Sequence, residues 1–356
     1  MKKNWKKFLC IAMALCLIFA LAACGGGNKD ADTDADATDT GDTTEASSDF
    51  DGAPTFDLKI AHPQPDGSST DLGYRKFAEL MEEYTEGTVK ATIYPAGSLV
   101  SSAEAVEGLR NGTIDIAQIS SGDAATVIPA LNLIEVPGSY SQANTDYVEG
   151  LAPAMREAMD PYGIHFLYPQ PGSPSWLFSN LKQITSPDDT KGLKVRASGK
   201  YGGLAIERWG GSPVTITLAD LTTAMERNTV DVILTPGLGA YSNGWYELEH
   251  FITVSDISTL MAMMTISKSL WDQMTPAQQE AVDRAALDGA MHMYEETLKE
   301  MEEGMGVMEA YGNELYTLTD AENALFIDAL QPLRDEVVAE VGAEAEKLEA
   351  ELAKFR

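Results

Sequence analysis

Apolar and polar residues along most of the chain follow a pattern that predicts short buried strands alternating with amphipathic helices. A strand over residues 56–61 is followed by a helix over 72–84, whose apolar residues recur at helical spacing. A strand over 89–94, a helix that begins at Ser101 and a strand over 113–119 come next. Two successive β-α-β units of this kind predict a lobe built on a mostly parallel sheet with helices around it.

A further β-α-β unit is predicted within residues 192–237. An apolar strand ends at Arg196, a helix covers 218–227, and a second apolar strand over 230–235 runs into a Pro-Gly turn. Ligands of open α/β sheets bind beyond the carboxyl ends of the strands. Because Arg196 and Thr235 both stand at such ends, the pattern predicts a pocket that contains one cation.

The chain is predicted to pass between two lobes more than once. Three prolines and a glycine in residues 169–175 indicate a crossing, and the apolar strand 261–266 indicates a return to the first lobe. The roughly 300 residues from Thr55 onward also exceed what one hydrophobic core usually holds. We expect an α/β fold of two lobes, each a mostly parallel sheet flanked by helices, joined by a hinge and followed by a long C-terminal helix region. The expected parts are a first lobe of residues 55–174 with about 258–300 and a second lobe of residues 175–257 with about 301–356.

The N-terminus has the layout of a secretory signal peptide. Four lysines in the first seven residues precede an apolar run over residues 8–23, which is short for a membrane span of about 20 apolar residues. The sequence Leu-Ala-Ala-Cys that ends at Cys24 resembles a bacterial lipobox. This resemblance implies that residues 1–23 are removed and that Cys24 carries a lipid anchor; a plain signal peptide cut nearby is the alternative.

Composition predicts an acidic tether after the lipid-bearing cysteine. Residues 28–51 contain nine acidic residues, one lysine and almost no large apolar side chain, so they cannot offset the entropy of ordering. We expect residues 24–54 to be disordered. The formal charge of −30 argues against nucleic acid and anionic lipid as partners, although solubility alone accounts for it.

The sequence lacks the residue patterns that disulfides, metal sites and common catalytic sites require. Of the three cysteines, Cys10 and Cys16 leave with the signal peptide, so no intramolecular disulfide can form. The four histidines are scattered without ligand-like spacing, and neither a nucleophile elbow nor a phosphate-binding glycine loop occurs. We expect no cofactor, no metal and no enzymatic activity.

Several short stretches keep one order and spacing from about residue 56 to about residue 280. In the first lobe they are Phe77-Ala78-Glu79, residues 89–95 and Gly112-Thr113-Ile114-Asp115, and in the second lobe Lys191-Gly192-Leu193-Lys194-Val195-Arg196, Gly210-Gly211-Ser212-Pro213, Val230-Asp231 and Trp245-Tyr246-Glu247-Leu248. As an ordered set they resemble the DctP-like solute-binding proteins of tripartite ATP-independent periplasmic (TRAP) transporters.

The resemblance implies a periplasmic-binding-protein-like fold and an extracytoplasmic receptor at the outer face of the bacterial cytoplasmic membrane. Such a receptor captures a small organic acid by closure of its lobes and delivers it to the TRAP permease subunits. The arginine that ends the Gly-Leu-Lys-Val-Arg strand is the carboxylate clamp of the family, and Arg196 stands there. A planar guanidinium fits a carboxylate with two parallel hydrogen bonds. A salt bridge between the lobes or at the surface is the alternative role.

Two positions depart from the family pattern. Trp176 stands where many members carry a second arginine, and Thr235 where an asparagine is often found. A ligand with two or three anionic groups would lose partners at both positions, whereas Trp176 offers an apolar face. We therefore predict a monocarboxylate with an apolar or aromatic body. The alternative is that Trp176 packs inside the lobe, as most buried tryptophans do.

Other pocket candidates carry weaker signals, and each could equally be an ordinary loop or core residue. They are His62, Gln64, Ser120, Ser121, Leu218 and Tyr201. Two further functions are kept as alternatives: a lipid-anchored ligand sensor, and a hydrolase that uses Ser120 or Ser121 with His62. A hydrolase predicts turnover, whereas a receptor predicts saturable binding without product.

Overall fold

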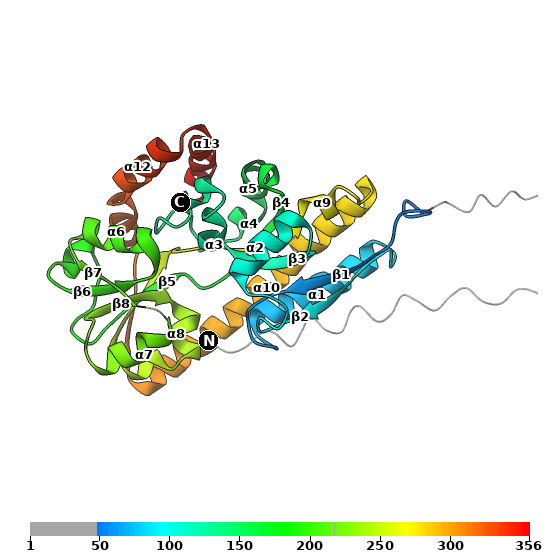
Figure 1. Ribbon diagram of the computed structural model, residues 1–356. Helices are drawn as coiled ribbons and strands as arrows, with labels where there is room; N and C mark the ends of the chain where they lie inside the picture. Colours follow the sequence, from blue (N-terminus) through cyan, green and yellow to red (C-terminus); the bar gives the residue numbers. More distant parts are fainter. Residues whose placement is uncertain (1–47, 217) are drawn as a thin grey trace, which may run out of the picture. The chain divides into compact units, whose positions relative to one another are not determined.

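The computed structural model describes residues 48–216 and 218–356, which form two mixed β-sheets with helices packed around them (Figure 1). The predicted signal peptide 1–23 and Cys24 lie outside the described residues. Each sheet is the centre of one lobe, so the two-lobed α/β fold that the sequence predicts is confirmed.

The sheet of the first lobe has the strand order β2-β1-β3-β10-β4 in the described part of the chain. Strand β1 pairs parallel with β2 and β3, whereas β10 pairs antiparallel with β3 and β4. Strand β10 is therefore the one that runs against the others. The strands are β1 (Phe56–Ala61), β2 (Val89–Tyr94), β3 (Ile116–Ser120), β4 (Ile164–Gln170) and β10 (Ala262–Ser267).

The sheet of the second lobe has the order β11-β9-β5-β8-β6-β7 over the same described residues. Its reversed strand is β5, which pairs antiparallel with β8 and β9, while the other pairs are parallel. The strands are β5 (Ser175–Ser179), β6 (Lys194–Ala197), β7 (Ser212–Thr215), β8 (Val232–Pro236), β9 (Phe251–Ile257) and β11 (Glu314–Thr317).

The reversed strand of each sheet is the one that arrives from the other lobe. Strand β5 follows β4 after residues 171–174, and β10 follows β9 after residues 258–261. The register places the start of β10 beside Ser120, the last residue of β3, and the start of β5 beside Pro236, the last residue of β8. The carboxyl ends of β3 and β8 therefore flank the two crossing segments, where a ligand site of an α/β fold is expected.

The helices begin where the capping residues predict. Capping boxes start α2 at Ser101, α10 at Thr275 and α11 at Thr319, so each first turn has its exposed N–H groups satisfied. Beside the first sheet lie α1 (Ser69–Tyr84), α2 (Ser102–Asn111), α3 (Ser121–Ala125), α4 (Asp146–Gly150), α5 (Ala152–Met159) and α9 (Lys268–Trp271). The second lobe has α6 (Gly199–Trp209), α7 (Leu218–Glu226) and α8 (Gly237–Ser242).

Helix α10 (Pro276–Tyr311) packs along α1 and continues to the second lobe, where it contacts α8 and β11 (Figure 1). Glycine allows the close approach to α1: a Cβ at Gly289 would lie 2.8 Å from Phe77 Cβ, and one at Gly73 would lie 2.6 Å from Met293 Cβ. The one helix therefore belongs to both lobes.

The C-terminal helices correct one predicted boundary. Helix α11 (Asp320–Asp328) contacts β9 of the second lobe, but α12 (Gln331–Val341) and α13 (Ala343–Leu352) pack on α5 and on the short helix η2 (Pro129–Leu133). The prediction assigned residues up to 356 to the second lobe. Leu333, Val337, Leu348 and Leu352 of these two helices are buried there. Ile327 and the Phe355 ring, on either side of the two helices, lie against Gly138 and Gly150 of the first lobe.

The predicted tether also ends earlier than residue 54. Ser48 Oγ donates a hydrogen bond to Glu86 Oε2 at 2.6 Å, and Gln278 Nε2 donates to the carbonyl oxygen of Pro54 at 2.7 Å. Residues 48–54 are thus held against the first lobe by Glu86, which follows the end of α1, and by Gln278 of α10.

Candidate functional site

A polar cavity of about 680 Å³ lies beside the crossing segments and takes residues from both lobes. Its lining includes residues 64–70 and Tyr140 from the first lobe, residues 170–173 of the first crossing, and Pro236, Leu238 and Asn243 from the second lobe. Gln142 of the first lobe, Thr259 and Leu260 of the second crossing, Ala262 of β10, and Thr297 and Glu300 of α10 also line it. We refer to this cavity as the interlobe cleft.

Two glutamine side chains give the interlobe cleft much of its polar character. Gln142 Nε2 donates to Tyr140 Oη at 3.1 Å, and Gln170 Nε2 donates to Thr70 Oγ1 at 2.8 Å. The Oε1 atom of each amide is buried without a hydrogen-bond partner. A buried acceptor without a donor costs free energy, so both amide oxygens are suited to accept hydrogen bonds from the hydroxyl groups of a ligand. The sequence predictions missed both residues. Only Gln170 could have been found, because it ends strand β4 just before the crossing, where a ligand site is expected.

Arg196 is buried on β6, with 2% of its surface exposed. Its Nε and Nη2 donate to the carbonyl oxygen of Ile216 at 3.1 and 3.0 Å, and its Nη1 donates weakly to that of Leu234 at 3.5 Å. No ion pair among the described residues includes Arg196, and burial lowers the pKa of its guanidinium. Of the five N–H donors, these three bonds leave one on Nη1 and one on Nη2 without a partner among the described residues, and a carboxylate can accept from such donors. The side chain is not in the lining of the interlobe cleft.

Trp176 is part of strand β5 of the second lobe. It is 1% exposed and packs with Phe178 and with Met308 of α10. The lining of the interlobe cleft does not include it. It lines an adjoining cavity of about 310 Å³, which shares Gln142, Gly172 and Thr297 with the cleft. Alternate residues of a strand face opposite sides of a sheet, and the register of β5 turns this ring toward α10. Trp176 is thus a packed residue beside the interlobe cleft, and its role as a wall of the ligand pocket stays a prediction.

Thr235 pairs in register with Trp176 across β5 and β8, and it is also buried. The neighbouring residue Leu234 supplies the carbonyl oxygen that accepts from Arg196 Nη1, at 3.5 Å. The end of β8 therefore lies close to Arg196, but the contact is made by the backbone of Leu234 and not by the side chain of Thr235. The side chain of Thr235 is absent from the lining of the interlobe cleft.

His62 and Gln64 follow β1 and have different surroundings. His62 is 1% exposed, with Nε2 at 3.1 Å from Asp71 Oδ1 and its ring stacked on Tyr74 at 5.1 Å between centroids. Burial is the main cause that lowers the pKa of His62, so this imidazole is a packed core group. Gln64, by contrast, lines the interlobe cleft as predicted.

Ser120 and Ser121 make contacts within the first lobe. Ser120 Oγ caps α3 and donates to Asp123 Oδ2 at 2.8 Å. Ser121 Oγ donates to Glu135 and accepts from the backbone N–H of Met261 at 2.9 Å, so it ties the second crossing to β3. Burial raises the pKa of Glu135 to about 7. Neither hydroxyl is hydrogen-bonded to His62 among these described contacts, so the arrangement that a hydrolase needs is not formed.

The last two candidates lie in the second lobe. Tyr201 on α6 is 7% exposed, belongs to a hydrophobic core, and has Lys200 Nζ 5.0 Å from its ring centroid. Leu218 is the first residue of α7, and the prediction about its side chain falls outside the described part of the structure.

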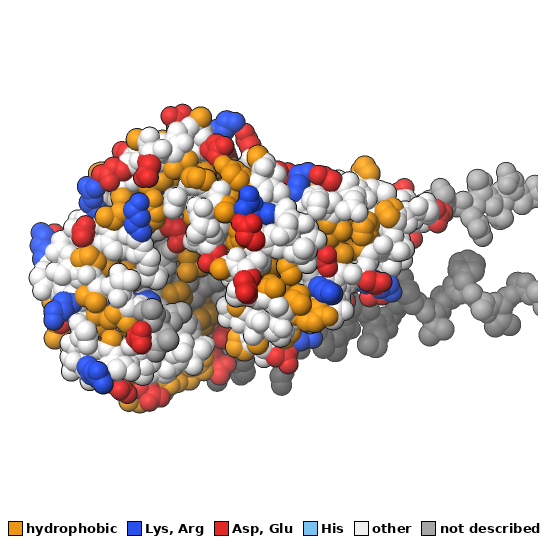
Figure 2. Space-filling view, viewed as in Figure 1, with side chains coloured by type: hydrophobic (Ala, Val, Ile, Leu, Met, Phe, Trp, Pro, Cys, Tyr) orange, Lys and Arg blue, Asp and Glu red, His pale blue; other side chains and the backbone are white. Residues whose placement is uncertain are grey.

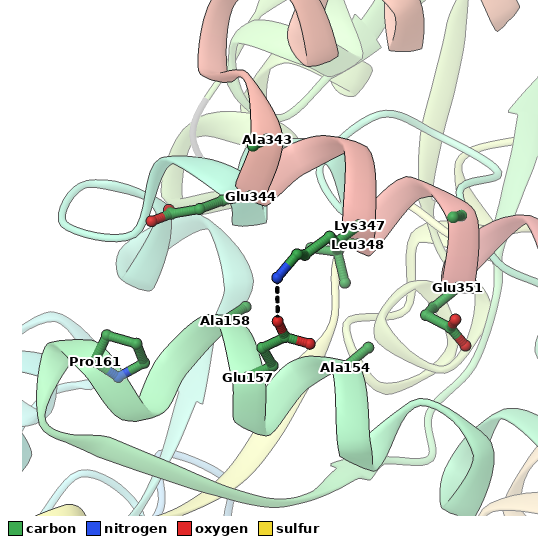
Figure 3. Close-up of a pocket in the computed structure, with 10 residues that line it drawn as sticks. Ala154, Glu157, Ala158, Pro161, Ala343, Glu344, Lys347, Leu348 and Glu351 are labelled. Atoms are coloured by element: carbon green, nitrogen blue, oxygen red, sulfur yellow. Dashed lines mark hydrogen bonds and ion pairs between the residues drawn. The ribbon is translucent and has the colours of Figure 1, made fainter.

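A second cavity of about 570 Å³ is a groove between α5 and α13 (Figure 3). Its walls include four alanines, and Lys347 of α13 reaches across it to pair with Glu157 of α5. It lies within the first lobe and away from both crossing segments. In Figure 2, acidic and basic side chains are scattered side by side over the visible face rather than gathered into a patch of one sign.

The described residues contain no group of three or more His, Cys, Asp or Glu side chains that could hold a metal ion. None of their helices is both long and apolar enough to span a membrane.

Comparison with known proteins assigns a family to this architecture. The model of the family described as bacterial extracellular solute-binding protein, family 7 (DctP), matches residues 60–340. The 2,3-diketo-L-gulonate-binding periplasmic protein YiaO of Escherichia coli is 23% identical over 298 residues, which are 82% of this chain and 90% of that protein.

Two solved structures show the same fold. A TRAP periplasmic solute-binding protein from Ochrobactrum anthropi has a TM-score of 0.77 at 22% identity, with 85% of this chain and 96% of that chain covered. One from Chromohalobacter salexigens with bound D-glucuronate has a TM-score of 0.71 at 20% identity, with 84% and 100% covered.

Proposed function

The chain belongs to the DctP family of bacterial extracellular solute-binding proteins, and on this premise we propose that it captures a hydroxylated organic acid for a TRAP-type permease. Members of this family are extracytoplasmic receptors for small organic acids that work with membrane permeases, and they are not enzymes. Binding followed by lobe closure is therefore the activity to be explained, and hydrolysis is set aside.

The buried guanidinium of Arg196 is the single observation that carries the proposal. A cation taken out of water without a counterion costs several kcal/mol, and a bound carboxylate removes that cost. The carbonyl oxygens of Ile216 and Leu234 hold the planar group in place while one N–H on each terminal nitrogen stays available. Closure of the lobes would bring the ligand carboxylate to this edge in a low dielectric, which strengthens the ion pair.

The character of the interlobe cleft supports a ligand rich in hydroxyl groups. Gln64, Gln142 and Gln170 line it, and two of their amide oxygens lack donors. Similar proteins bind 2,3-diketo-L-gulonate in Escherichia coli and D-glucuronate in Chromohalobacter salexigens, and both ligands are sugar acids. A sugar acid would use its carboxylate at Arg196 and its hydroxyls at the glutamines, and this is the class we propose.

The sequence favoured an apolar or aromatic monocarboxylate, an argument that depended on Trp176. Its packing against α10 removes the main support for that ligand class. A Trp176→Ala variant separates the two ligand classes, because a loss of ligand affinity would indicate that the Trp176 ring contacts the ligand. Unchanged affinity together with lower stability is the result that a core residue gives.

A thermal-shift screen of the purified protein tests the proposal. The panel contains sugar acids, C4-dicarboxylates, aliphatic and aromatic monocarboxylates, and neutral sugars. A ligand that binds only the folded state adds about 4 kcal/mol to the free energy of unfolding at a thousandfold excess over Kd, and this raises Tm. We expect shifts from sugar acids and none from their neutral analogues. Shifts from apolar acids alone would restore the original prediction, and shifts from neutral sugars alone would contradict a carboxylate clamp.

We also propose that a lipid on Cys24 holds the receptor at the outer face of the cytoplasmic membrane. The lipobox-like sequence before Cys24 supports this. Mass spectrometry of the N-terminal peptide from membranes tests it: a diacylglyceryl-modified cysteine is expected, whereas an unmodified N-terminus would mean simple secretion.

A further inference from the structure

A small cavity of about 240 Å³ lies where α10 ends against the segment that leads into β9. Its lining is Asn180, Glu247, Leu248, Glu249, His250, Tyr311, Gly312 and Asn313. It belongs to the second lobe and shares no lining residue with the interlobe cleft. Two glutamates, two asparagines and a tyrosine supply side-chain oxygens to this lining, and the Nδ2 atoms of Asn180 and Asn313 already donate to backbone carbonyl oxygens.

Glu249 is the most unusual residue of this cavity. It is 7% exposed, its Oε2 is buried without a hydrogen-bond partner, and it enters no ion pair among the described residues. Burial raises the pKa of Glu249 to about 8, with no neighbouring positive charge acting on it. A buried carboxylate needs either a proton or a cation.

Asn313 adds a second unpartnered oxygen. Its Nδ2 donates to the carbonyl oxygens of Tyr246 and Glu249, at 2.9 and 2.6 Å. These two bonds fix the orientation of the amide, so that the other end is an acceptor. That acceptor, Oδ1, is buried without a partner.

The C-terminus of α10 adds negative potential at the same place. This helix has 36 residues, ends in the left-handed Gly312, and has no basic residue in its last turn. The carbonyl end of a helix carries about half a negative charge and favours a cation within one turn. Among the lining residues the only basic side chain is His250, which is engaged with Glu314 Oε1 at 3.1 Å.

We propose that this cavity is a binding site for a hard divalent cation of the Ca²⁺ type, held by the Glu249 carboxylate and the Asn313 amide oxygen. Ca²⁺ accepts carboxylate, amide and water oxygens in irregular geometry, whereas Mg²⁺ demands a near-ideal octahedron. The cavity volume leaves room for the water ligands that so few protein oxygens require. The bound cation would join the end of α10 to the segment before β9 and so stabilise the second lobe.

Two readouts on the full protein test this site. We expect CaCl₂ to raise Tm by about 2–4 °C at tenfold excess over Kd, with Kd of about 0.1–1 mM. Tb³⁺ should show luminescence when the nearby aromatic side chains, including Tyr311, are excited, and Ca²⁺ should displace it. Equal concentrations of NaCl and MgCl₂ control for ionic strength.

Glu249→Gln should abolish both Ca²⁺ effects while the shift caused by the organic acid remains. Glu309→Gln is the matched control, because it removes one exposed charge from the same helix end and should leave both effects unchanged. If Glu249→Gln does not fold, Glu249→Asp should fold with Ca²⁺ affinity reduced about tenfold. No Ca²⁺ effect in the wild type at pH 7 and pH 9, or equal effects in Glu249→Gln, would overturn the proposal and leave a proton as the neutralising group.

Discussion

The guanidinium of Arg196 and the carbonyl oxygen of Ile216 are joined by two hydrogen bonds, from Nε at 3.1 Å and from Nη2 at 3.0 Å. One backbone oxygen thus fixes the plane of the cation, and Nη1 donates weakly to Leu234 O at 3.5 Å. If Arg196 is the clamp that we propose, these backbone carbonyls of the second lobe set where the ligand carboxylate binds.

Arg196→Ala should weaken binding of the acid by about 3–5 kcal/mol, because the ligand carboxylate is left buried and unpaired. Arg196→Lys keeps the charge but loses the planar fork, so we expect a large part of the same loss. Isothermal titration calorimetry measures both affinities, with circular dichroism as the check on folding. Wild-type affinity in a folded Arg196→Ala variant would show that the clamp is another residue.

Gln170→Leu should weaken binding of a hydroxylated acid by about 1–3 kcal/mol, because it removes an acceptor from the cleft. The affinity for an analogue that lacks the hydroxyls should change little. Thr70→Val is the matched control, since it removes the partner of Gln170 Nε2 and keeps Oε1. Equal losses for both ligands would indicate a change in the shape of the cleft instead of a lost hydrogen bond.

Two glycines of α10 give a paired test of its packing on α1. Gly289→Ala places a Cβ 2.8 Å from Phe77 Cβ and 3.1 Å from the Phe77 backbone, so we expect a loss of about 1–3 kcal/mol in the free energy of unfolding. Gly306→Ala meets nothing within 4 Å and should stabilise the helix by about 0.5–1 kcal/mol. Urea denaturation measures both variants, and a neutral Gly289→Ala would mean that the two helices can move apart without cost.

Stability should fall as the pH rises from about 4.5 to about 7 through the titration of Glu135. Burial raises the pKa of this carboxyl from 4.5 to about 7, while Ser121 lowers it and Asp123 raises it further. Within this window the folded state binds more protons than the unfolded state, so unfolding becomes easier with each step in pH. Glu135→Gln should flatten that part of the profile in thermal melts, and an unchanged slope would assign it to other groups such as Glu249.

Local patterns in the sequence determined the elements and the broad class of the protein. The capping residues Ser101, Thr275 and Thr319 mark helix starts that the structure reproduces, because a cap depends on side chains within one turn. The hydrophobic periodicity and the prolines at 169–175 were sufficient for two lobes and a crossing. The ordered stretches between about residues 56 and 280 identified the family that the comparisons show.

Only the tertiary structure decided which side chains meet. The direction of Trp176 depends on the register of β5 against β8 and β9, which the sequence of one strand does not contain. Gln142 and Gln170 come together at the cleft through contacts between segments that are distant in sequence. The return of α12 and α13 to the first lobe likewise depends on contacts with η2 and α5, where Leu333, Val337 and Leu348 are buried. Periodicity reports which face of an element is buried, whereas the partner of that face is chosen by packing over the whole chain.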